Sequence, residues 1–302
     1  MSEPTARDLG EFGLIAAVTA RLPGSPAVLL GPGDDAAVVA VPDGRVVATT
    51  DVLVEGVHFR RDWSSAYDVG RKAAAANLAD VAAMGGTASA LLVGLAAPAD
   101  LAVSWALELA DGLRDEAALV GAAVVGGDTV AAPQVVVSVT ALGSLEGPPV
   151  TRAGARPGDQ VVVVGRLGWA AAGLRLLGRG VTEGPLVEAH RRPCPPYAMG
   201  PVLAAAGATA MCDVSDGLAQ DLGHIASASG VAVELDARSL ADEAVSLEDV
   251  LTGGEDHALV ATLPAGPVPE GCRVVGRVVA GSGVRVDGRD VGGTGGGWEH
   301  WA

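Results

Sequence analysis

The sequence predicts a mixed α/β (α+β) protein built from two domains. Its 302 residues are enough for two domains, and 49% of them are apolar, which is ample for a sizeable core. Alanine-rich segments of helical character alternate with short valine-rich runs, a pattern typical of α/β architecture. The segment EGPPV at 146–150 interrupts this pattern, so we expect one domain over 1–147 and a second over 148–302.

The first half is expected to hold an antiparallel sheet and long helices. Apolar residues recur at helical spacing over 11–22 and stop at Pro23. The turn Pro42-Asp43-Gly44 is expected to join its flanking runs as a hairpin. The helices expected here are 11–22, 67–84 and 100–120, and the strands are 27–30, 36–41, 46–50, 90–96 and 135–142.

The second half repeats the alternation of strands and helices. We expect strands at 161–164, 231–235, 258–262 and 274–279, and helices at 169–177, 197–206 and 217–229. The backbone amides at the start of the last helix are expected to face a phosphate, because a helix N-terminus attracts anions.

Charge and composition exclude several classes of function. The net charge is −16 and Lys72 is the only lysine, so a nucleic-acid surface is not expected. Three widely spaced cysteines predict neither a disulfide framework nor a zinc site, and they fit a reducing cytoplasm. The longest uncharged stretches, 81–99 and 193–212, are broken by glycine or proline, and the N-terminus lacks a leader pattern. We therefore expect a cytoplasmic protein without a membrane span.

Carboxylates recur beside glycine or small hydroxyl residues at the expected ends of strands and starts of helices. They are Asp34, Asp35, Asp51, Asp128, Asp213, Asp216, Glu255 and Asp256. Each one alone is more often a helix cap or a turn residue, but five such loops in one chain indicate a shared site. Carboxylates that converge repel one another and require cations, and Mg²⁺ prefers carboxylate oxygens while leaving positions open for phosphate. Asp80 differs because it lies on a helix face, three residues after Asn77.

Familiar nucleotide-binding motifs are missing. A P-loop requires G-x-x-x-x-G-K-[ST], but Lys72 stands in GRKAAAAN, and no H-R-D loop of the protein-kinase type occurs. Use of ATP must therefore depend on glycine-rich backbone, arginine and metal.

Eight segments, in order along nearly the whole chain, resemble the thiamine-monophosphate kinase family of the PurM-like (aminoimidazole-ribonucleotide-synthetase) superfamily. They are GEFGLI (10 to 15), GPGDDAAV (31 to 38), TTDVLVEGVHF (49 to 59), NLADVAAMG (77 to 85), GGDT (126 to 129), TRAGARPGD (151 to 159), DVSDGLAQDLGHIA (213 to 226) and GGEDHALV (253 to 260). The resemblance implies an N-terminal α/β domain whose strands pair with a second subunit into a dimeric β-barrel, and a C-terminal α/β domain. It also implies transfer of the γ-phosphoryl group of ATP to thiamine monophosphate, directly and in line, with several Mg²⁺ ions in a homodimer.

The resemblance further implies roles for individual residues. The implied metal ligands are Asp35, Thr49, Thr50, Asp51, Asp80, Asp128, Asp213 and Asp216, of which Asp128, Asp213 and Asp216 are the expected catalytic residues. The implied nucleotide contacts are Gly127, Asp128, Arg152 and Ser215, and the implied contacts to thiamine monophosphate are His58, Glu255 and Trp298. Alternation along a strand places the side chain of Asp34 opposite to that of Asp35.

Departures from the family pattern and rival functions remain. Thr49 replaces a serine and His257 replaces a more usual tyrosine, while the tail ends with Trp298 and Trp301. One alternative is another PurM-like ATP-dependent enzyme, such as aminoimidazole ribonucleotide synthetase. A non-catalytic metal-binding homologue is the other, and the intact acids at every motif argue against it.

Overall fold

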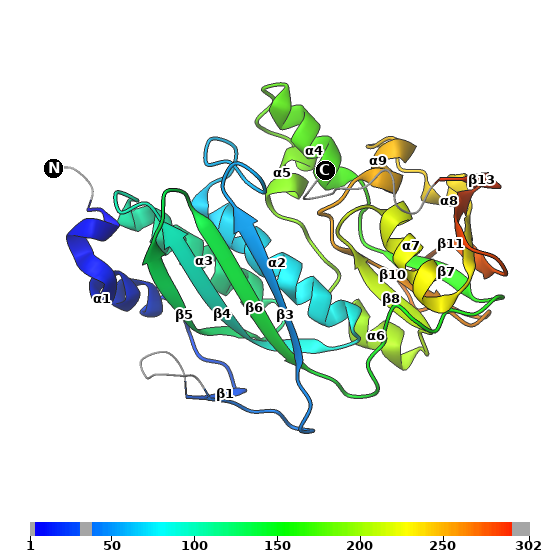
Figure 1. The fold of residues 1–302 in the computed structure, drawn as a ribbon, viewed down its shortest axis with the longest axis horizontal. Helices are drawn as coiled ribbons and strands as arrows, with labels where there is room; N and C mark the ends of the chain where they lie inside the picture. Colours follow the sequence, from blue (N-terminus) through cyan, green and yellow to red (C-terminus); the bar gives the residue numbers. More distant parts are fainter. Residues whose placement is uncertain (1–3, 31–37, 292–302) are drawn as a thin grey trace. The chain divides into compact units, whose positions relative to one another are not determined.

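A computed structural model describes residues 4–30 and 38–291, and it divides the chain into two compact units (Figure 1). The first unit is Met1–Val81 with Thr87–Ser144, and the second is Ala82–Gly86 with Leu145–Ala302. No helix in the described ranges is both long enough and apolar enough to cross a bilayer.

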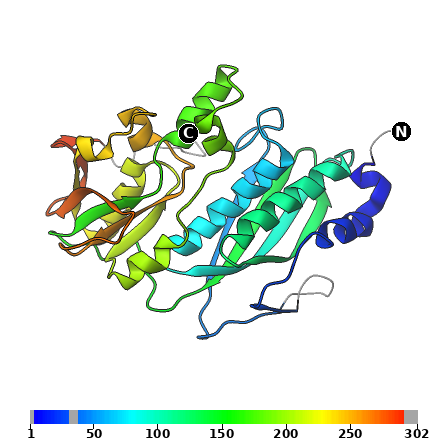
Figure 2. The same ribbon diagram turned by 180° about the vertical axis from the view of Figure 1, so that it is seen from behind.

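The first unit is a sheet with helices against one face. In order, its elements are α1 (Ala6–Thr19), β1 (Val28–Leu30), β2 (Val38–Val39), β3 (Val47–Val54), α2 (Ala66–Ala83), β4 (Thr87–Ala97), α3 (Val103–Ala118), β5 (Ala123–Ala131) and β6 (Val136–Ser144). Among the described residues the main sheet has four strands in the order β3-β6-β4-β5, with β4 and β5 parallel. Helices α2 and α3 lie on one face of this sheet (Figure 2).

Sequence patterns locate α2 well. Its alanines at positions 73 to 75 are at most 2% exposed, because small side chains let the helix approach the sheet closely. The long helix expected over 67–84 is therefore confirmed. Helix α1 begins earlier than expected, since Thr5 and Asp8 form a capping box at its start.

Two expectations for the first unit are wrong. The hairpin across Pro42-Asp43-Gly44 does not form: β2 pairs with β1, and β3 pairs along its whole length with the distant β6. The GGDT segment lies inside β5, because parallel pairing with β4 satisfies its backbone hydrogen bonds. Local turn and glycine signals cannot reveal such distant partners.

The sheet of the first unit is open in the described residues. Strands β3 and β5 stand at its two edges, so one chain forms no closed barrel there. The expected barrel thus does not exist within a single copy of the chain.

The second unit has a seven-stranded sheet in the described residues, in the order β13-β12-β9-β11-β7-β10-β8. The strands are β7 (Gln160–Val164), β8 (Ala210–Val214), β9 (Ala232–Leu235), β10 (Ala258–Leu263), β11 (Arg273–Val279), β12 (Gly283–Val286) and β13 (Arg289–Asp290). The helices are α4 (Trp169–Gly178), α5 (Pro185–Arg191), α6 (Met199–Ala205), α7 (Leu218–Ser229), α8 (Ala237–Leu240) and α9 (Leu247–Thr252). All of the strands and helices expected in this half are present, whereas β8 and the short elements α5, α8, α9, β12 and β13 were not expected.

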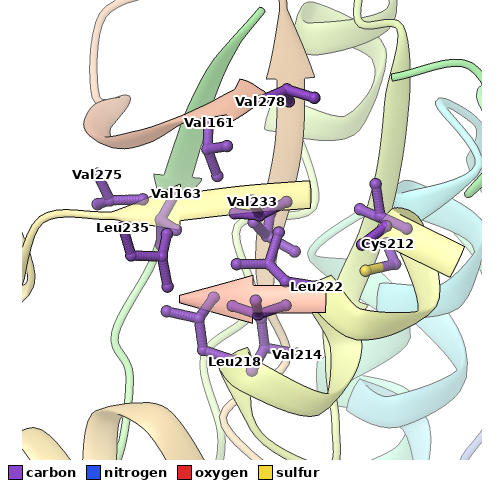
Figure 3. Packing of buried hydrophobic residues seen from close by; sticks show 14 of the residues in the cluster. Val161, Val163, Cys212, Val214, Leu218, Leu222, Val233, Leu235, Val275 and Val278 are labelled. Carbon is purple, nitrogen blue, oxygen red and sulfur yellow. The ribbon is translucent and has the colours of Figure 1, made fainter. Parts of the chain in front are cut away.

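Alternation along β7 builds a core on each face of this sheet. Val161 and Val163 pack in a cluster with α7, whereas Val162 and Val164 pack in a second cluster that includes Leu203 of α6. Figure 3 shows side chains from α7, β7, β8, β9 and β11 gathered in the first cluster. This core anchors the end of β8, which carries Asp213, and the turn between β8 and α7, where Asp216 lies.

Candidate functional site

The helix-facing side of β3 carries one group of the expected ligands. Thr49 Oγ1 donates a hydrogen bond of 2.6 Å to Asp80 Oδ2 of α2. The N–H of Asp51 donates to Asn77 Oδ1 at 3.1 Å, and Asn77 is fully buried. Because alternate residues of a strand share a face, Thr49 and Asp51 both face α2. The structure therefore brings Thr49, Asp51 and Asp80 together.

Thr50 and Asp128 lie on the opposite, open face of the sheet. Thr140 Oγ1 donates to Thr50 Oγ1 at 3.0 Å. In the strand register Asp128 is paired with Gly94 of β4. Asp51 belongs to the adjacent row of paired residues across the sheet, so its side chain and that of Asp128 point to opposite faces. Within the first unit the expected metal ligands are thus divided between two faces.

Gly127 is required by a close approach of backbone rather than by a turn. A Cβ at this position would lie 1.9 Å from the carbonyl oxygen of Val93 in the neighbouring strand. Any side chain would therefore push β5 away from β4, and the absence of one holds the adjacent Asp128 in register.

His58 follows the end of β3 in a loop held by hydrogen bonds. Its Nδ1 accepts from the N–H of Val54 at 3.0 Å, which places the proton of a neutral ring on Nε2. Its carbonyl oxygen accepts from Lys72 Nζ at 3.2 Å, and Lys72 is only 4% exposed. The single lysine of the chain therefore supports this loop and does not act as a P-loop lysine.

In the second unit, the segments DVSDG (213 to 217) and GGEDH (253 to 257) run side by side. The N–H of Glu255 donates to the carbonyl of Ser215 at 2.8 Å, and that of His257 donates to the carbonyl of Val214 at 3.0 Å. These bonds extend the pairing of β8 with β10 and bring Ser215 and Glu255 together.

Asp213 is 4% exposed, and its Oδ2 lies 3.0 Å from Nδ1 of His257. His257 has a left-handed backbone, with φ of 51°, and Glu255 has φ of 66°. Such angles are uncommon for residues other than glycine and carry strain that the surrounding bonds must overcome. The histidine that departs from the family pattern is thus the partner of an expected metal ligand.

Asp221 takes up three backbone amides before α7, one of which the sequence led us to assign to a phosphate. Its Oδ2 accepts from the N–H groups of Ser215, Asp216 and Gly217, each at 3.1 Å. Burial, together with repulsion from Asp213, raises the pKa of the Asp221 carboxyl to about 7. The N–H of Gly217, at the start of the expected helix, is therefore occupied by a carboxylate of the chain, whereas the expectation that the following amides of this helix face a phosphate stays a prediction.

Asp256 serves α4 in a similar way. Its Oδ1 accepts from the N–H of Ala170 at 3.0 Å, near the start of that helix. Its Oδ2 is buried without a hydrogen-bond partner in the described part of the structure. Burial raises the pKa of the Asp256 carboxyl to about 6.

The backbone of Arg152 lies beside the C-terminal end of α7, whereas Ser215 precedes its N-terminal end. The carbonyl oxygen of Arg152 accepts from Ser229 Oγ at 3.2 Å, at the C-terminal end of the helix, whereas Ser215 precedes its N-terminal end. Twelve helical residues separate the two ends by about 18 Å. The structure therefore does not bring the backbones of these two expected nucleotide contacts together.

Comparison with known proteins assigns the family. Residues 33–145 match the family described as AIR synthase related protein, N-terminal domain, and residues 156–289 match the corresponding C-terminal domain. A thiamine-monophosphate kinase of Mycobacterium tuberculosis is 49% identical over 302 residues, which cover 95% of this chain and 90% of the relative.

The chain belongs to the thiamine-monophosphate kinase family. Solved structures agree with the two-domain, PurM-like α/β fold. A thiamine-monophosphate kinase from Stenotrophomonas maltophilia is 34% identical, with a TM-score of 0.81 over 92% of this chain and 96% of that chain. AaThiL complexed with AMPPCP and TMP is 35% identical, with a TM-score of 0.81 over 98% of each chain.

Two expected site residues of this thiamine-monophosphate kinase family member, Asp35 and Trp298, lie outside the described residues, as does Asp34. Sequence reasoning missed the buried Asp221 and gave no supporting role to the buried Asn77 or Asp256, which hold backbone groups within their own units. Asp221 falls within the DVSDGLAQD motif, but an acid in the first turn of a helix usually indicates only a favourable helix dipole. Its long reach back to the turn could not be read from the sequence.

The donor atoms of the expected ligands suit a hard divalent cation. No group of three or more His, Cys, Asp or Glu side chains is arranged to hold a metal within residues 4–30 and 38–291. The expected ligands supply carboxylate and hydroxyl oxygens and no thiolate, and Thr49 and Asp80 are already in contact. Oxygen donors of this kind fit Mg²⁺.

Proposed function

We propose that this chain transfers the γ-phosphoryl group of ATP to thiamine monophosphate, giving thiamine diphosphate and ADP. The observation that carries the proposal is the 49% identity to a thiamine-monophosphate kinase over 95% of the chain. A structural relative complexed with AMPPCP and TMP, alike over 98% of the chain, supports both substrates. Intact acids at every motif favour an enzyme over a non-catalytic homologue.

The acceptor chemistry explains why the site is acidic. A phosphate monoester has a second pKa near 6, so the acceptor is largely dianionic at neutral pH and needs no strong general base. The obstacle is repulsion between two polyanions, and phosphoryl transfer depends mainly on positioning and charge neutralisation. We infer direct in-line transfer without a phosphoenzyme.

Several Mg²⁺ ions complete the proposed site. The residues that would hold them are Asp35, Thr49, Thr50, Asp51, Asp80, Asp128, Asp213 and Asp216. When bound, Mg²⁺ supplies positive charge that neutralises the phosphate oxygens. Hydrogen bonding of Thr49 to Asp80 and of His257 to Asp213 would hold two of these carboxylates in fixed orientations.

The remaining residues are assigned to the two substrates. Gly127, Asp128, Arg152 and Ser215 are proposed nucleotide contacts, and His58, Glu255 and Trp298 are proposed contacts to thiamine monophosphate. In a neutral ring the proton of His58 lies on Nε2, and Glu255 carries a charge opposite to that of the thiazolium ring, with its side chain 34% exposed. Residues 1–147 would form the ATP-binding and dimerisation domain, and residues 148–302 the domain that completes the site.

A second copy of the chain is the proposed partner of the open sheet. Val52 and Leu92, which lie on the face opposite α2 and α3, are 47% and 38% exposed, and Val130 of the edge strand β5 is 56% exposed. Exposed apolar faces and unpaired strand edges are typical of interaction surfaces. Pairing of two such sheets would give the dimeric β-barrel.

Cys194, Cys212 and Cys272 are free thiols, which fits a reducing cytoplasm as the place of the reaction.

Release of ADP tests the proposal. The protein is incubated with ATP and Mg²⁺ and with thiamine monophosphate, free thiamine or formylglycinamidine ribonucleotide in separate reactions. We expect ADP only with thiamine monophosphate. Turnover confined to one of the other two acceptors would overturn the assignment.

A further inference from the structure

Three backbone amides of the turn between β8 and α7 donate to a single carboxylate oxygen. Asp221 lies in the first turn of α7 and is 2% exposed. Its Oδ2 accepts from three consecutive backbone amides, those of Ser215, Asp216 and Gly217, at 3.1 Å each. Hydrogen bonds from N–H groups to a carboxylate are stronger than those between neutral groups.

The geometry of Gly217 explains why the acceptor comes from inside the helix. Helices are normally capped by a Ser, Thr, Asp or Asn side chain at the residue before the first turn. Here that residue is Gly217, with φ of 128°, and a Cβ on it would lie 2.8 Å from the backbone carbon of Thr252. No side chain fits at the cap position, so Asp221 reaches back to supply the missing acceptor.

Further hydrogen bonds hold residues 215 and 216. The carbonyl oxygen of Ser215 accepts from the N–H of Glu255 at 2.8 Å, so both polar groups of the Ser215 backbone are fixed. Gln220 Nε2 donates to Asp216 Oδ2 at 3.3 Å. The side chains of Ser215 and Asp216 therefore project from a backbone whose path depends on Asp221.

We propose that Asp221 is a positioning residue that sets the divalent-cation affinity of the site by fixing the backbone of residues 215–217. The part of this inference that concerns cations rests on the function proposed above. Asp221 itself need not touch a cation or a phosphate, because its Oδ2 is engaged by the three amides.

Two substitutions separate the effect of the hydrogen-bond acceptor from the effect of the charge. Asp221→Ala removes the acceptor, and Asp221→Asn keeps one oxygen acceptor while removing the charge. Asp159→Ala is the matched control: Asp159 is 6% exposed and its Oδ2 accepts from the N–H of Arg156 and from Thr209 Oγ1, away from this turn. The control reports the general effect of removing a buried carboxylate from the second unit.

Two measurements are made on each variant of the full chain. Hydrogen exchange of the segment 213–217, measured by mass spectrometry without nucleotide or metal, reports how firmly Asp221 holds these backbone amides. Mn²⁺ binding in the presence of AMPPCP, followed by electron paramagnetic resonance, reports cation affinity without turnover. We expect Asp221→Ala to exchange faster in this segment and to bind Mn²⁺ about 10- to 100-fold more weakly, the effect typical of losing a group that orients a ligand.

The pattern across variants decides the proposal. Asp221→Asn should fall between the wild type and Asp221→Ala in both measurements, and Asp159→Ala should match the wild type in both. Unchanged exchange, or unchanged Mn²⁺ affinity despite faster exchange, would overturn the positioning role. If Asp221→Ala fails to fold, Asp221→Asn decides by the same criteria. Absence of ADP formation by the wild type would overturn the proposed function but leave the exchange and Mn²⁺ results standing.

Discussion

The buried carboxyl of Asp256 gives a quantitative prediction about pH and stability. Asp256→Asn replaces this carboxyl with an amide of nearly the same shape. The variant retains an oxygen that can accept from the N–H of Ala170, as Oδ1 does at 3.0 Å. It removes an ionisable group whose pKa is raised by burial to about 6.

The sign follows from proton linkage. The pKa of Asp256 is 3.8 in its ordinary state and about 6 in the folded protein, so the folded state binds more protons between these values. The stability of the wild type therefore falls as pH rises through this window. A shift of roughly 2 pKa units corresponds to about 3 kcal/mol, of which about 2 kcal/mol is lost between about pH 4.5 and about pH 7.5. The asparagine variant has no such loss, so it should gain about 2 kcal/mol on the wild type over that range.

Thermal unfolding at the two pH values measures this gain. A change of about 2 kcal/mol moves the melting temperature by roughly 3 °C in a protein of this size. Asp249→Asn is the control: burial raises the pKa of Asp249, but hydrogen bonds from Arg175 and Ser246 lower it overall. The ionised carboxylate of Asp249 stabilises the fold at pH values above its ordinary pKa of 3.8. The difference in stability between Asp249→Asn and the wild type should therefore stay constant over the same pH range. A constant offset for Asp256→Asn as well would refute the reasoning.

Four other predictions concern the site and the partner. Asp128→Asn should lower Mg²⁺-dependent ADP formation by about 10- to 100-fold, and intact turnover would remove the metal role assigned to that strand. Gly127→Ala should destabilise the protein by about 1–3 kcal/mol, because its Cβ would lie 1.9 Å from a backbone oxygen, and denaturant melts should show a smaller loss for Gly94→Ala, whose Cβ would lie 3.6 Å from its nearest neighbour. Trp298→Ala should raise the KM for thiamine monophosphate and spare that for ATP in steady-state kinetics; the reverse would move the residue to the nucleotide. Val52→Asp should shift the protein from dimer to monomer in analytical ultracentrifugation, since this side chain is 47% exposed on the open sheet face, and a wild-type monomer would contradict the proposed partner.

Local signals in the sequence were sufficient to locate helices and strands that have a clear residue pattern of their own. The alanine-rich α2, the valine-rich β7 and the apolar β10 appear where the sequence pattern predicts them. The hairpin across 42–44 failed because β3 pairs with β6, about 90 residues further along the chain. A turn signal describes four residues, whereas pairing depends on which distant strand satisfies the backbone.

The chemistry of the site was also largely readable from the sequence. The spacing and type of the acidic motifs indicate oxygen ligands for a hard cation, and eight motifs in register indicate the family. Alternation along the expected strand places Thr49 and Thr50 on opposite faces, but the sequence could not show which of the two faces α2, because that depends on the side on which α2 packs.

The sequence by itself determined the family, the acidic character of the site and most of the helices and strands, because these follow from residue type and short-range spacing. Only the tertiary structure decided which strands pair, and only it revealed the buried acids Asp221 and Asp256 that hold backbone amides at the starts of α7 and α4. A buried carboxylate acquires its role from the donors that surround it, and the folded chain alone determines which donors those are.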